Sequence, residues 1–356
     1  MGLELVNVIS SYLKKERPSV ALTSSLIEDA KSQGLGALLY ASYKDDRLKS
    51  IYFNSLILQE RFIKLTKYTS NLLSKYQIKH LIIKGSVLYK LYDDIAIRSR
   101  GDIDIYVNPN DYEEAINLMI KNGFIEGETC NHHTIMYYNE LEVEIHFTLF
   151  ESTHHKLLKY FKNPFDFAHQ VDNYMYEFNP DYHFIYSLAH FKNHLVNGSG
   201  FRYLLDFYYM ITKTKLDLNF IKQELPKIEL LKLYENIINA LYELCGTYLD
   251  DIPHYDVTFF MNYLNESGTY GFKRLKKEGS SIPKHKFKVI LDSLFIPNKE
   301  YRLKLYPHLG RHWLLYPILL IHRFFYLLTH KLHSLFRIIF KRRNKEEKEL
   351  FKKIGI

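Results

Sequence analysis

The chain has 356 residues, of which 47% are hydrophobic and 25% charged, and its formal net charge is +8. This composition is typical of a globular protein with a sizeable core and excludes global disorder. Residues 307–356 contain eleven Lys or Arg and three Glu, so this C-terminal tail carries the whole excess of positive charge. The balanced charge of the remaining body argues against a broad nucleic-acid surface there.

The two cysteines, Cys130 and Cys245, follow no spacing that is typical of a metal site. Neither belongs to a CxxC motif or to a Cys/His zinc pattern, so we expect reduced thiols rather than a disulfide. The N-terminal stretch MGLELVNVISSYLKKERPSV lacks the basic n-region and the cleavage site of a secretory signal peptide. These features predict a cytoplasmic location.

Residues 1–78 are predicted to form an N-terminal helical region. The stretch LKSIYFNSLILQERFIKLTKYTSNLLSKY has apolar residues at helical spacing and no strong helix breaker. The periodicity then changes: HLIIK predicts a short buried strand, and GSVLYKLYDD predicts a helix that begins at Gly85 and Ser86. The next stretch, DIDIYV, alternates with period two, which predicts a second strand.

The central region, residues 79–175, is predicted to be a small α/β unit. NPNDYEEAINLMIKNGF has a capping Asn or Asp, a helical pattern and a glycine stop near Gly123. HHTIMYYN and LEVEIHFTLF predict two adjacent strands. Residues 176–306 return to helical spacing, and residues 307–356 form the basic tail. The expected class is therefore α+β, with a mixed sheet of about 4–5 strands inside a mostly helical protein.

Two aspartates on the predicted strand DIDIYV carry the first chemical signal. Asp102 and Asp104 are two positions apart, so they project from the same face of the strand, where their charges repel each other. A cation is the usual remedy, and Mg²⁺ commonly binds one or two carboxylates together with substrate phosphates. Glu144, in the stretch EVEIH, supplies a third carboxylate. Glu142 lies on the same face two positions earlier and is the reserve candidate.

The glycine–serine pair before the predicted helix fits the same picture. Gly85 allows a ligand to approach the backbone closely, and Ser86 can donate its hydroxyl to a phosphate oxygen. A helix N-terminus also presents backbone N–H groups and the positive end of its dipole to an anion. Phosphate at Gly85–Ser86 and Mg²⁺ at Asp102 and Asp104 would meet in one substrate, a nucleoside triphosphate.

Together these motifs resemble the nucleotidyltransferase superfamily of the DNA polymerase beta type. More narrowly, IIKGSVLYKLYDDIAIRSRGDIDIYV, EVEIHFTLF and HFIYSLAHFKNH…FRYLLDFYYM are similar to a largely uncharacterised bacterial nucleotidyltransferase family, over roughly residues 45–330. The resemblance implies that residues 79–175 are the catalytic core and that Gly85 and Ser86 hold a triphosphate. It implies that Asp102 and Asp104 bind two Mg²⁺ ions, with Mn²⁺ as an alternative. Glu144 would complete the metal site and help to activate an acceptor hydroxyl.

The resemblance also implies an activity. An NMP group would move from an NTP, with ATP as the first candidate, to an unidentified acceptor (a small molecule, a sugar or a protein) with release of pyrophosphate. The alternative is a non-catalytic nucleotide-binding or membrane-associated assembly module that keeps the fold. An incomplete carboxylate set would favour this alternative, and the set here is complete.

Three basic residues flank these motifs and are candidates for nucleotide binding. Lys84 closes the strand before Gly85, and it either contacts phosphate or is an ordinary solvated lysine. Arg98 and Arg100 precede the aspartate pair. Either could neutralise triphosphate charge with its planar guanidinium group, or form a salt bridge with a nearby carboxylate.

Histidines form two further groups of candidates. His132, His133 and His146 lie on neighbouring predicted strands, and without a cysteine to support them a zinc site is not expected. His146 shares a face with Glu144 and is the candidate of the three for nucleotide binding.

The second group lies in the helical region after the core. His190 and His194 are four positions apart, which places them on one face of a helix, and both are candidates for nucleotide binding. With Arg202 and Asp206 they either line the nucleotide or acceptor pocket or form a buried polar network that ties two helices together.

The tail stretch WLLYPILLIHRFFYLLTHKLHSLFRIIFKRR is apolar and basic and has no acidic residue. Its apolar run is too short and too interrupted for a membrane span. We expect residues 312–345 to form an amphipathic helix on an anionic membrane surface, which would make the protein peripheral on the inner face of the membrane. The expected anchors are Trp313, Phe324, Phe325 and Phe336. The alternative is a helix packed on the body with a solvated basic end.

Overall fold

The computed structural model describes residues 3–99, 101–268, 291, 294–296, 299–306, 313–330 and 345–356. Its strands are β1 (His80–Ile83), β2 (Asp102–Val107), β3 (Ile125–Thr129), β4 (His133–Tyr138), β5 (Leu141–His146), β6 (Ala168–Asp172) and β7 (Met175–Phe178). Its α-helices are α1 (Leu3–Leu13), α2 (Ser24–Ser32), α3 (Gly36–Tyr43), α4 (Lys49–Lys75), α5 (Gly85–Leu88), α6 (Tyr112–Lys121), α7 (His155–Tyr160), α8 (Pro180–Asn197), α9 (Arg202–Lys213), α10 (Leu218–Glu224), α11 (Leu231–Cys245), α12 (Thr258–Ser267), α15 (Lys299–Leu305), α16 (Tyr316–His330) and α18 (Lys345–Ile354). Short 3-10 helices are η1 (Asp46–Leu48), η2 (Tyr89–Leu91), η3 (Ile95–Ile97), η4 (Pro164–Phe167), η5 (Leu225–Ile228) and η7 (Trp313–Leu315).

The described strands form one mixed sheet of seven strands, in the order β3-β4-β5-β2-β1-β7-β6. Strand β2 pairs in parallel with β5, and β1 pairs in parallel with β7, whereas the other neighbours are antiparallel. The predicted α+β class is confirmed, but the sheet is larger than the 4–5 strands expected. The additional strands β3, β6 and β7 lie toward the two ends of the sheet, where partial exposure removes the apolar alternation that identifies a buried strand.

Separate apolar clusters cover the two faces of the sheet. On one face, Ile103, Ile105 and Val143 pack with buried residues of α4 and α6. On the other face, Leu81 and Ile83 join the larger cluster formed by the N-terminal helices and α8 to α12. Because side chains alternate along a strand, the even-numbered acidic residues of β2 and β5 lie on this second face, toward the helical body.

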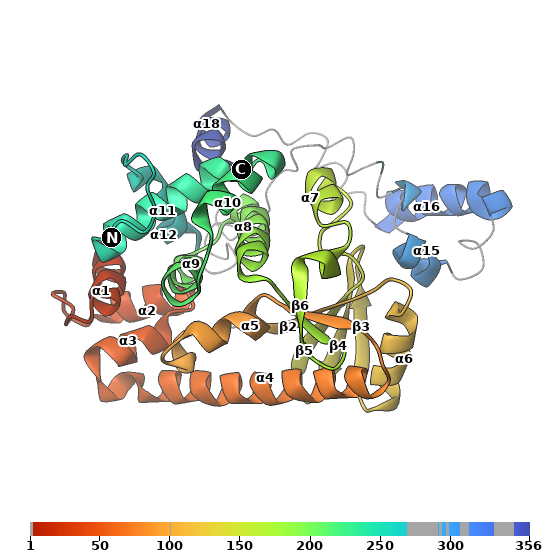
Figure 1. Cartoon of the computed structure of the whole chain (residues 1–356), viewed down its shortest axis with the longest axis horizontal. Helices are drawn as coiled ribbons and strands as arrows, with labels where there is room; N and C mark the ends of the chain where they lie inside the picture. The colour runs from red at the N-terminus through yellow and green to blue at the C-terminus, as the bar shows by residue number, and fades with distance from the viewer. Residues whose placement is uncertain are drawn as a thin grey trace.

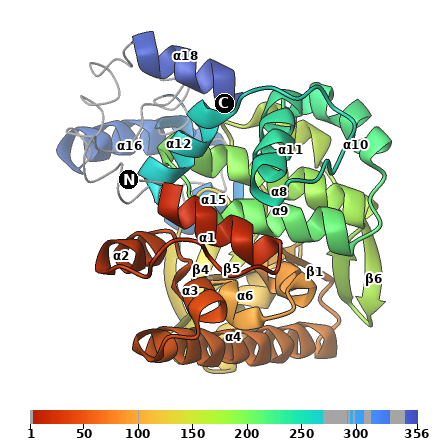
Figure 2. The ribbon, with the colours of Figure 1, turned by 90° about the vertical axis from the view of Figure 1, so that its left-hand side faces the viewer.

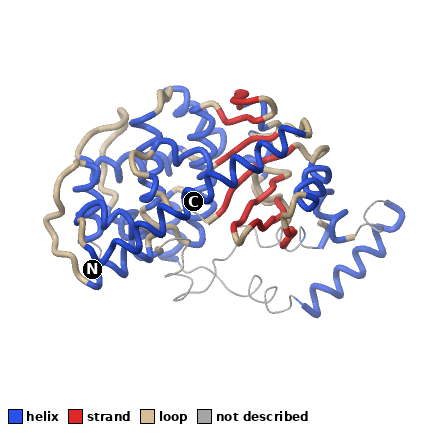
Figure 3. The backbone as a smooth tube through the Cα atoms, turned by 90° about the horizontal axis from the view of Figure 1, so that it is seen from below, coloured by secondary structure: helices blue, strands red, loops and turns tan. Residues whose placement is uncertain are grey.

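The helices form a body beside the sheet, from which α4 extends to cover one face. Figure 1 shows α4 running from the N-terminal helices to the strands, and Figure 3 shows the strands gathered at one side of the helical body. Figure 2 shows α1 and α3 between α4 and the later helices, in agreement with the contacts that α3 makes with α4 and α1 makes with α11. The sheet face that carries the acidic residues is thus bounded by helices from the second half of the chain.

The segment after β1 differs from the long helix predicted there. Helix α5 ends at Leu88 and continues as one 3-10 turn, after which Tyr92 adopts extended backbone angles. The positive φ of this junction belongs to Lys84 (φ 52°, ψ −130°) and not to the glycine that follows it. Gly85 is therefore required for another reason, which is the close approach of a side chain described below.

The C-terminal region divides into parts with different surroundings. Helix α18 packs against α11: Phe351 and Ile354 are buried, and the Asn236 side chain donates to the carbonyl oxygens of Lys353 and Ile354. Helix α16, in contrast, leaves several apolar side chains exposed. Within the described residues, no helix combines the length and the apolar character that a membrane span requires.

Candidate active site

Three carboxylates converge on the face of the sheet that points toward the helical body. Asp104 of β2 lies directly beside Glu144 of β5 in the parallel register, and Asp102 lies beside Glu142. Asp102, Asp104 and Glu144 each offer a carboxylate oxygen, and these oxygens lie within 4.8 Å of one another. Glu142 does not belong to this group. The shared face that the alternation of DIDIYV predicted is therefore present, and Glu144 is better placed than the reserve candidate.

Lys84 supplies positive charge to this site. Its ammonium group forms an ion pair with Asp104 Oδ1, and its side chain is only 16% exposed. Burial opposes the charged form of the lysine, but Asp104 together with Tyr186, Glu144 and Asp102 outweighs this and raises the pKa of Lys84 well above its ordinary value. The interpretation of Lys84 as an ordinary solvated lysine is therefore wrong. The strand pairing explains why, because Ile83 faces Asp104 across β1 and β2 and brings the next residue to the carboxylate.

The two aspartates have opposite electrostatic surroundings. Burial, reinforced by the neighbouring charge of Asp104, raises the pKa of Asp102 to about 7. Burial also acts on Asp104, but Lys84 and His146 overcome it and lower the pKa of that carboxyl. Such a split is expected of two acids that share one site without enough positive charge for both. A bound cation would allow both aspartates to be ionised.

His146 lies beneath the carboxylates and connects two of them. Its Nε2 is 3.0 Å from Asp104 Oδ1 and 3.1 Å from Glu144 Oε2, and the residue is 1% exposed. Burial opposes a charged imidazole, but these hydrogen bonds raise the pKa of His146. The same contact lowers the pKa of Glu144, against the effect of its burial. The contacts of His146 make it a residue that positions Asp104 and Glu144, and its role in nucleotide binding stays a prediction.

Arg98 was predicted either to bind nucleotide or to form a salt bridge, and the structure shows its salt bridge. Its Nε and Nη2 donate to the two carboxylate oxygens of Asp206 at 2.8 and 3.0 Å, and the guanidinium is buried. Tyr92 donates its hydroxyl to the same carboxylate at 2.7 Å. The alternative of a salt bridge is therefore the observed one. Arg100 lies outside the described residues.

The Arg98 side chain explains the glycine at position 85. A Cβ atom on Gly85 would lie 2.6 Å from Arg98 Nη1, and the bidentate pair with Asp206 leaves that guanidinium no freedom to move away. Arg202 takes part in the same region, since its Nη1 donates to the carbonyl oxygen of Ser99 at 2.6 Å. Asp206 and Arg202 thus belong to a buried network that joins α9 to the segment before β2.

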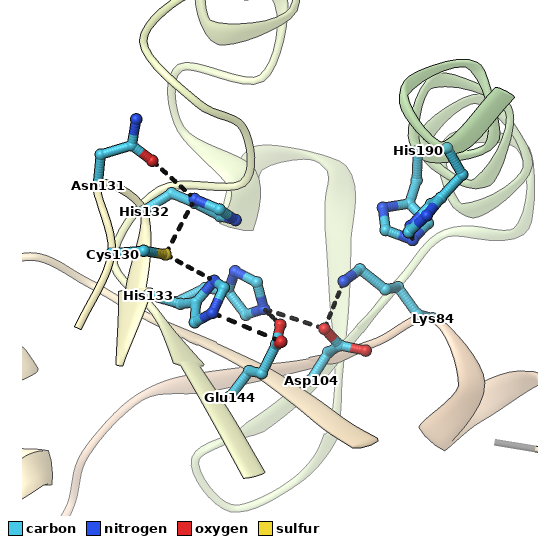
Figure 4. A network of polar contacts seen from close by, with 10 residues as sticks. Lys84, Asp104, Cys130, Asn131, His132, His133, Glu144 and His190 are labelled. Atoms are coloured by element: carbon cyan, nitrogen blue, oxygen red, sulfur yellow. Dashed lines mark hydrogen bonds and ion pairs between the residues drawn. The ribbon is translucent and has the colours of Figure 1, made fainter. Parts of the chain in front are cut away.

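The remaining predicted residues surround Lys84. Ser86 is 2% exposed at the start of α5. His190 and His194 of α8 share a hydrogen bond between their Nε2 atoms at 2.8 Å, and Figure 4 shows His190 across from Lys84. Burial, reinforced by the nearby Lys84 charge, lowers the pKa of both imidazoles, that of His194 to about 4. They are therefore neutral groups that can accept or donate one hydrogen bond.

Cys130 lies beside the site, although the sequence did not predict it as a site residue. The turn between β3 and β4 brings its Sγ to 3.4 Å from His132 Nδ1 and 3.3 Å from His133 Nδ1. The expectation that these histidines have no cysteine beside them was wrong, because CNHH matches none of the spacings by which zinc sites are recognised. Both cysteines are free thiols, as expected.

A mixed sheet with three converging carboxylates, next to a Gly-Ser turn, is the arrangement expected of a nucleotidyltransferase. The sequence matches the family described as "Uncharacterised nucleotidyltransferase" over residues 23–246, which is more than half of the chain, and the protein belongs to this family. The match begins earlier and ends earlier than the resemblance over roughly residues 45–330 suggested, and it leaves out the C-terminal region. No curated protein matches the sequence.

Proposed function

We propose that the protein transfers a nucleoside monophosphate group from a nucleoside triphosphate, with ATP as the first candidate, to an acceptor and releases pyrophosphate. The convergence of Asp102, Asp104 and Glu144 within 4.8 Å supports this proposal, together with membership of a nucleotidyltransferase family. The acceptor is a hydroxyl or phosphate group of a small molecule, a sugar or a protein.

The donor set fits divalent magnesium, with manganese as the alternative. All three groups are carboxylates, the oxygen ligands that Mg²⁺ prefers. Asp104 is buried, Asp102 is half-buried, and Lys84 is the cation that pairs with Asp104. The raised pKa of Asp102 reflects this shortage of positive charge. When bound, two ions would stabilise the attacking and the leaving oxygen of an in-line displacement.

The chain's own residues would hold and orient the reactants. Asp102 and Asp104 would hold the ions, and Glu144, kept ionised by its contact with His146, would accept a hydrogen bond from the acceptor hydroxyl. Lys84, released from Asp104 by the incoming cation charge, would pair with a phosphate oxygen beside Gly85 and Ser86. The new oxygen–phosphorus bond forms as the bond to the pyrophosphate oxygen breaks, and positioning of the two in line is the main contribution of the protein.

The first experiment measures thermal melting with Mg²⁺ and each NTP in turn. A ligand at about 100 times its Kd stabilises the folded state by about 2.7 kcal/mol, which corresponds to a shift of roughly 5 °C for a protein of this size. We expect a Mg²⁺-dependent shift that is lost in Asp102→Asn/Asp104→Asn. Glu142→Gln is the matched control, because Glu142 lies on the same strand face but outside the carboxylate group.

Turnover is then tested with the NTP that gives the largest shift. Release of pyrophosphate, or transfer of an α-labelled nucleotide to protein or to small molecules of an extract, would identify the acceptor class. Binding without any transfer would favour the second candidate, a non-catalytic nucleotide-binding module. No Mg²⁺-dependent shift with any NTP would contradict both.

We also propose that α16 rests on an anionic membrane surface. Apolar residues of α16 and of the preceding turn are 50–70% exposed, namely Leu314, Ile318, Ile321, Phe324 and Phe325. Of the other predicted anchors, Phe336 and the side chain of Trp313 lie outside the described residues. Co-sedimentation with phosphatidylglycerol vesicles, compared with phosphatidylcholine vesicles, tests this. Phe324→Ser/Phe325→Ser should abolish binding, and equal recovery of this variant would contradict the proposal.

A further inference from the structure

The turn between β3 and β4 carries three side chains of metal-ligand type on a rigid backbone. The Cys130 N–H donates to the carbonyl oxygen of His133 at 2.9 Å, and the next pair outward, Thr129 and Thr134, is in register. The Phe147 N–H donates to the carbonyl oxygen of His132 at 3.1 Å, which ties the turn to the end of β5. These hydrogen bonds hold the backbone from which the Cys130, His132 and His133 side chains project.

The distances within this turn are those of a tetrahedral metal site. Cys130 Sγ lies 3.4 Å from His132 Nδ1 and 3.3 Å from His133 Nδ1, as Figure 4 shows. A tetrahedral Zn²⁺ with Zn–S of about 2.3 Å and Zn–N of about 2.05 Å would separate each such pair of ligand atoms by about 3.6 Å. The three ligand atoms also lie within 4.8 Å of one another. The two sulfur–nitrogen distances therefore need to change by only a few tenths of an ångström to accept an ion.

Hydrogen bonds already hold these groups together in the metal-free protein. The thiol proton can be donated to only one of the two imidazole nitrogens that face Cys130 Sγ, and the sulfur can accept from the other. His132 Nδ1 is also 2.9 Å from Asn131 Oδ1, so in the metal-free protein it carries a proton that the amide oxygen accepts. A metal ion would displace this proton and the thiol proton, as metal binding to such ligands generally does.

We propose that Cys130, His132 and His133 bind one Zn²⁺ ion, with the fourth position taken by water. One thiolate and two imidazole ligands select a soft or borderline cation, whereas the all-carboxylate group of Asp102, Asp104 and Glu144 selects Mg²⁺. The two sites are thus neighbours with different ion preferences. The zinc site does not depend on nucleotide binding or on the proposed transfer reaction.

The geometry also links this zinc site to Glu144. The other ring nitrogen of His133, Nε2, lies 3.5 Å from Glu144 Oε1, and the ligand atoms of His133, Glu144 and His146 lie within 4.8 Å of one another. Zn²⁺ on Nδ1 fixes the tautomer of His133 with its proton on Nε2, where the carboxylate can accept it. Carboxylate–histidine–zinc arrangements of this kind orient both the imidazole and the acid. His133 therefore becomes a positioning residue for the third carboxylate.

Cobalt titration of the full-length metal-free protein tests the zinc site directly. Co²⁺ substitutes for Zn²⁺ and gives a near-ultraviolet charge-transfer band only when a thiolate is a ligand. We expect one Co²⁺ per chain with this band, and displacement of the band by stoichiometric Zn²⁺. Cys130→Ser should abolish the band and weaken binding by at least about 100-fold, since loss of even an outer partner costs about 10–100-fold.

Matched variants separate this site from the other cation site and from the other cysteine. Cys245→Ser should leave the band unchanged, because Cys245 lies at the end of α11 with Thr247 as its partner. Asp102→Asn/Asp104→Asn should keep the band as well. His132→Gln should weaken Co²⁺ binding while the thiolate band persists at saturation, which provides a second test if Cys130→Ser does not fold. No band in the wild type, or a band that survives Cys130→Ser, would overturn the proposal.

Discussion

Replacement of Arg98 by Met tests whether this residue holds the fold of the site or binds the triphosphate. The guanidinium is 4% exposed and pairs through two hydrogen bonds with Asp206, whose side chain is 5% exposed. Removal of one partner from such a pair leaves an uncompensated buried charge and costs about 3–5 kcal/mol. For a chain of this size we expect the melting temperature to fall by roughly 4–7 °C.

The matched control is the other bidentate arginine pair, which is exposed. Arg47 donates to both carboxylate oxygens of Asp45 at 2.9 Å, but its side chain is 60% exposed. Arg47→Met should leave the stability almost unchanged, because exposed ion pairs contribute little. Urea unfolding of both variants gives the comparison. Equal stability losses, or an Arg98→Met variant that melts like the wild type and only loses NTP affinity, would refute the structural role assigned to Arg98.

Three further predictions concern Gly85, Asp102 and His80. Gly85→Ala should lower the free energy of unfolding by about 1–3 kcal/mol, because its Cβ would lie 2.6 Å from Arg98 Nη1. A double-mutant cycle should show a smaller loss when the same substitution is made in the Arg98→Met background. Protons should compete with Mg²⁺ for Asp102, whose pKa is raised to about 7, so the apparent Mg²⁺ affinity measured by calorimetry should rise about tenfold from pH 6 to pH 8. A Mg²⁺ affinity that does not depend on pH would contradict this assignment. In the metal-free protein, the raised pKa of Asp102 stabilises the folded state at low pH, and this stabilisation is lost as the pH rises from about 4 through about 7. Burial lowers the pKa of His80 to about 4, whereas the pKa of an unfolded-state histidine is about 6.5. The unfolded chain therefore takes up this proton at a higher pH than the folded protein does. The free energy of unfolding should fall by up to about 3 kcal/mol as the pH drops from about 6.5 to about 4. Urea midpoints of His80→Gln should show a flatter profile over this range, and an unchanged profile would count against the shift.

The central strands could be predicted from sequence because their burial leaves a plain pattern. HLII has three successive apolar residues after His80 and is fully buried, and DIDIYV alternates because one face packs on α4 and α6 while the other carries the acids. The edge strand β6, AHQVD, has no such pattern, since four of its five residues are exposed. Period and composition report burial, and strands that are not buried escape them.

Local sequence pattern likewise predicts only part of the candidate site. The shared face of Asp102 and Asp104 follows from the period of one strand, and their proximity to Glu144 needs only the pairing of β2 with β5. The partner of Arg98 could not be predicted in this way, because Asp206 is 108 positions away on α9. Cys130 is adjacent to its histidines in sequence, but only the hairpin geometry shows that the three side chains point to one position.

The backbone at Lys84 joins these observations. A non-glycine residue at φ 52° and ψ −130° is strained, and strain of this kind, about 1–3 kcal/mol, persists only where the surroundings enforce it. Here β1 must end opposite Asp104, and the next residue must be a glycine because Arg98 lies against it. Position 84, between the end of β1 and Gly85, requires a cation while no metal is bound, because Asp104 is buried and ionised. A glycine at position 84 would relieve the backbone but remove the ion pair with Lys84 and leave His146 to compensate Asp104 without it. The strain at Lys84 is therefore a consequence of the charge requirement of the site.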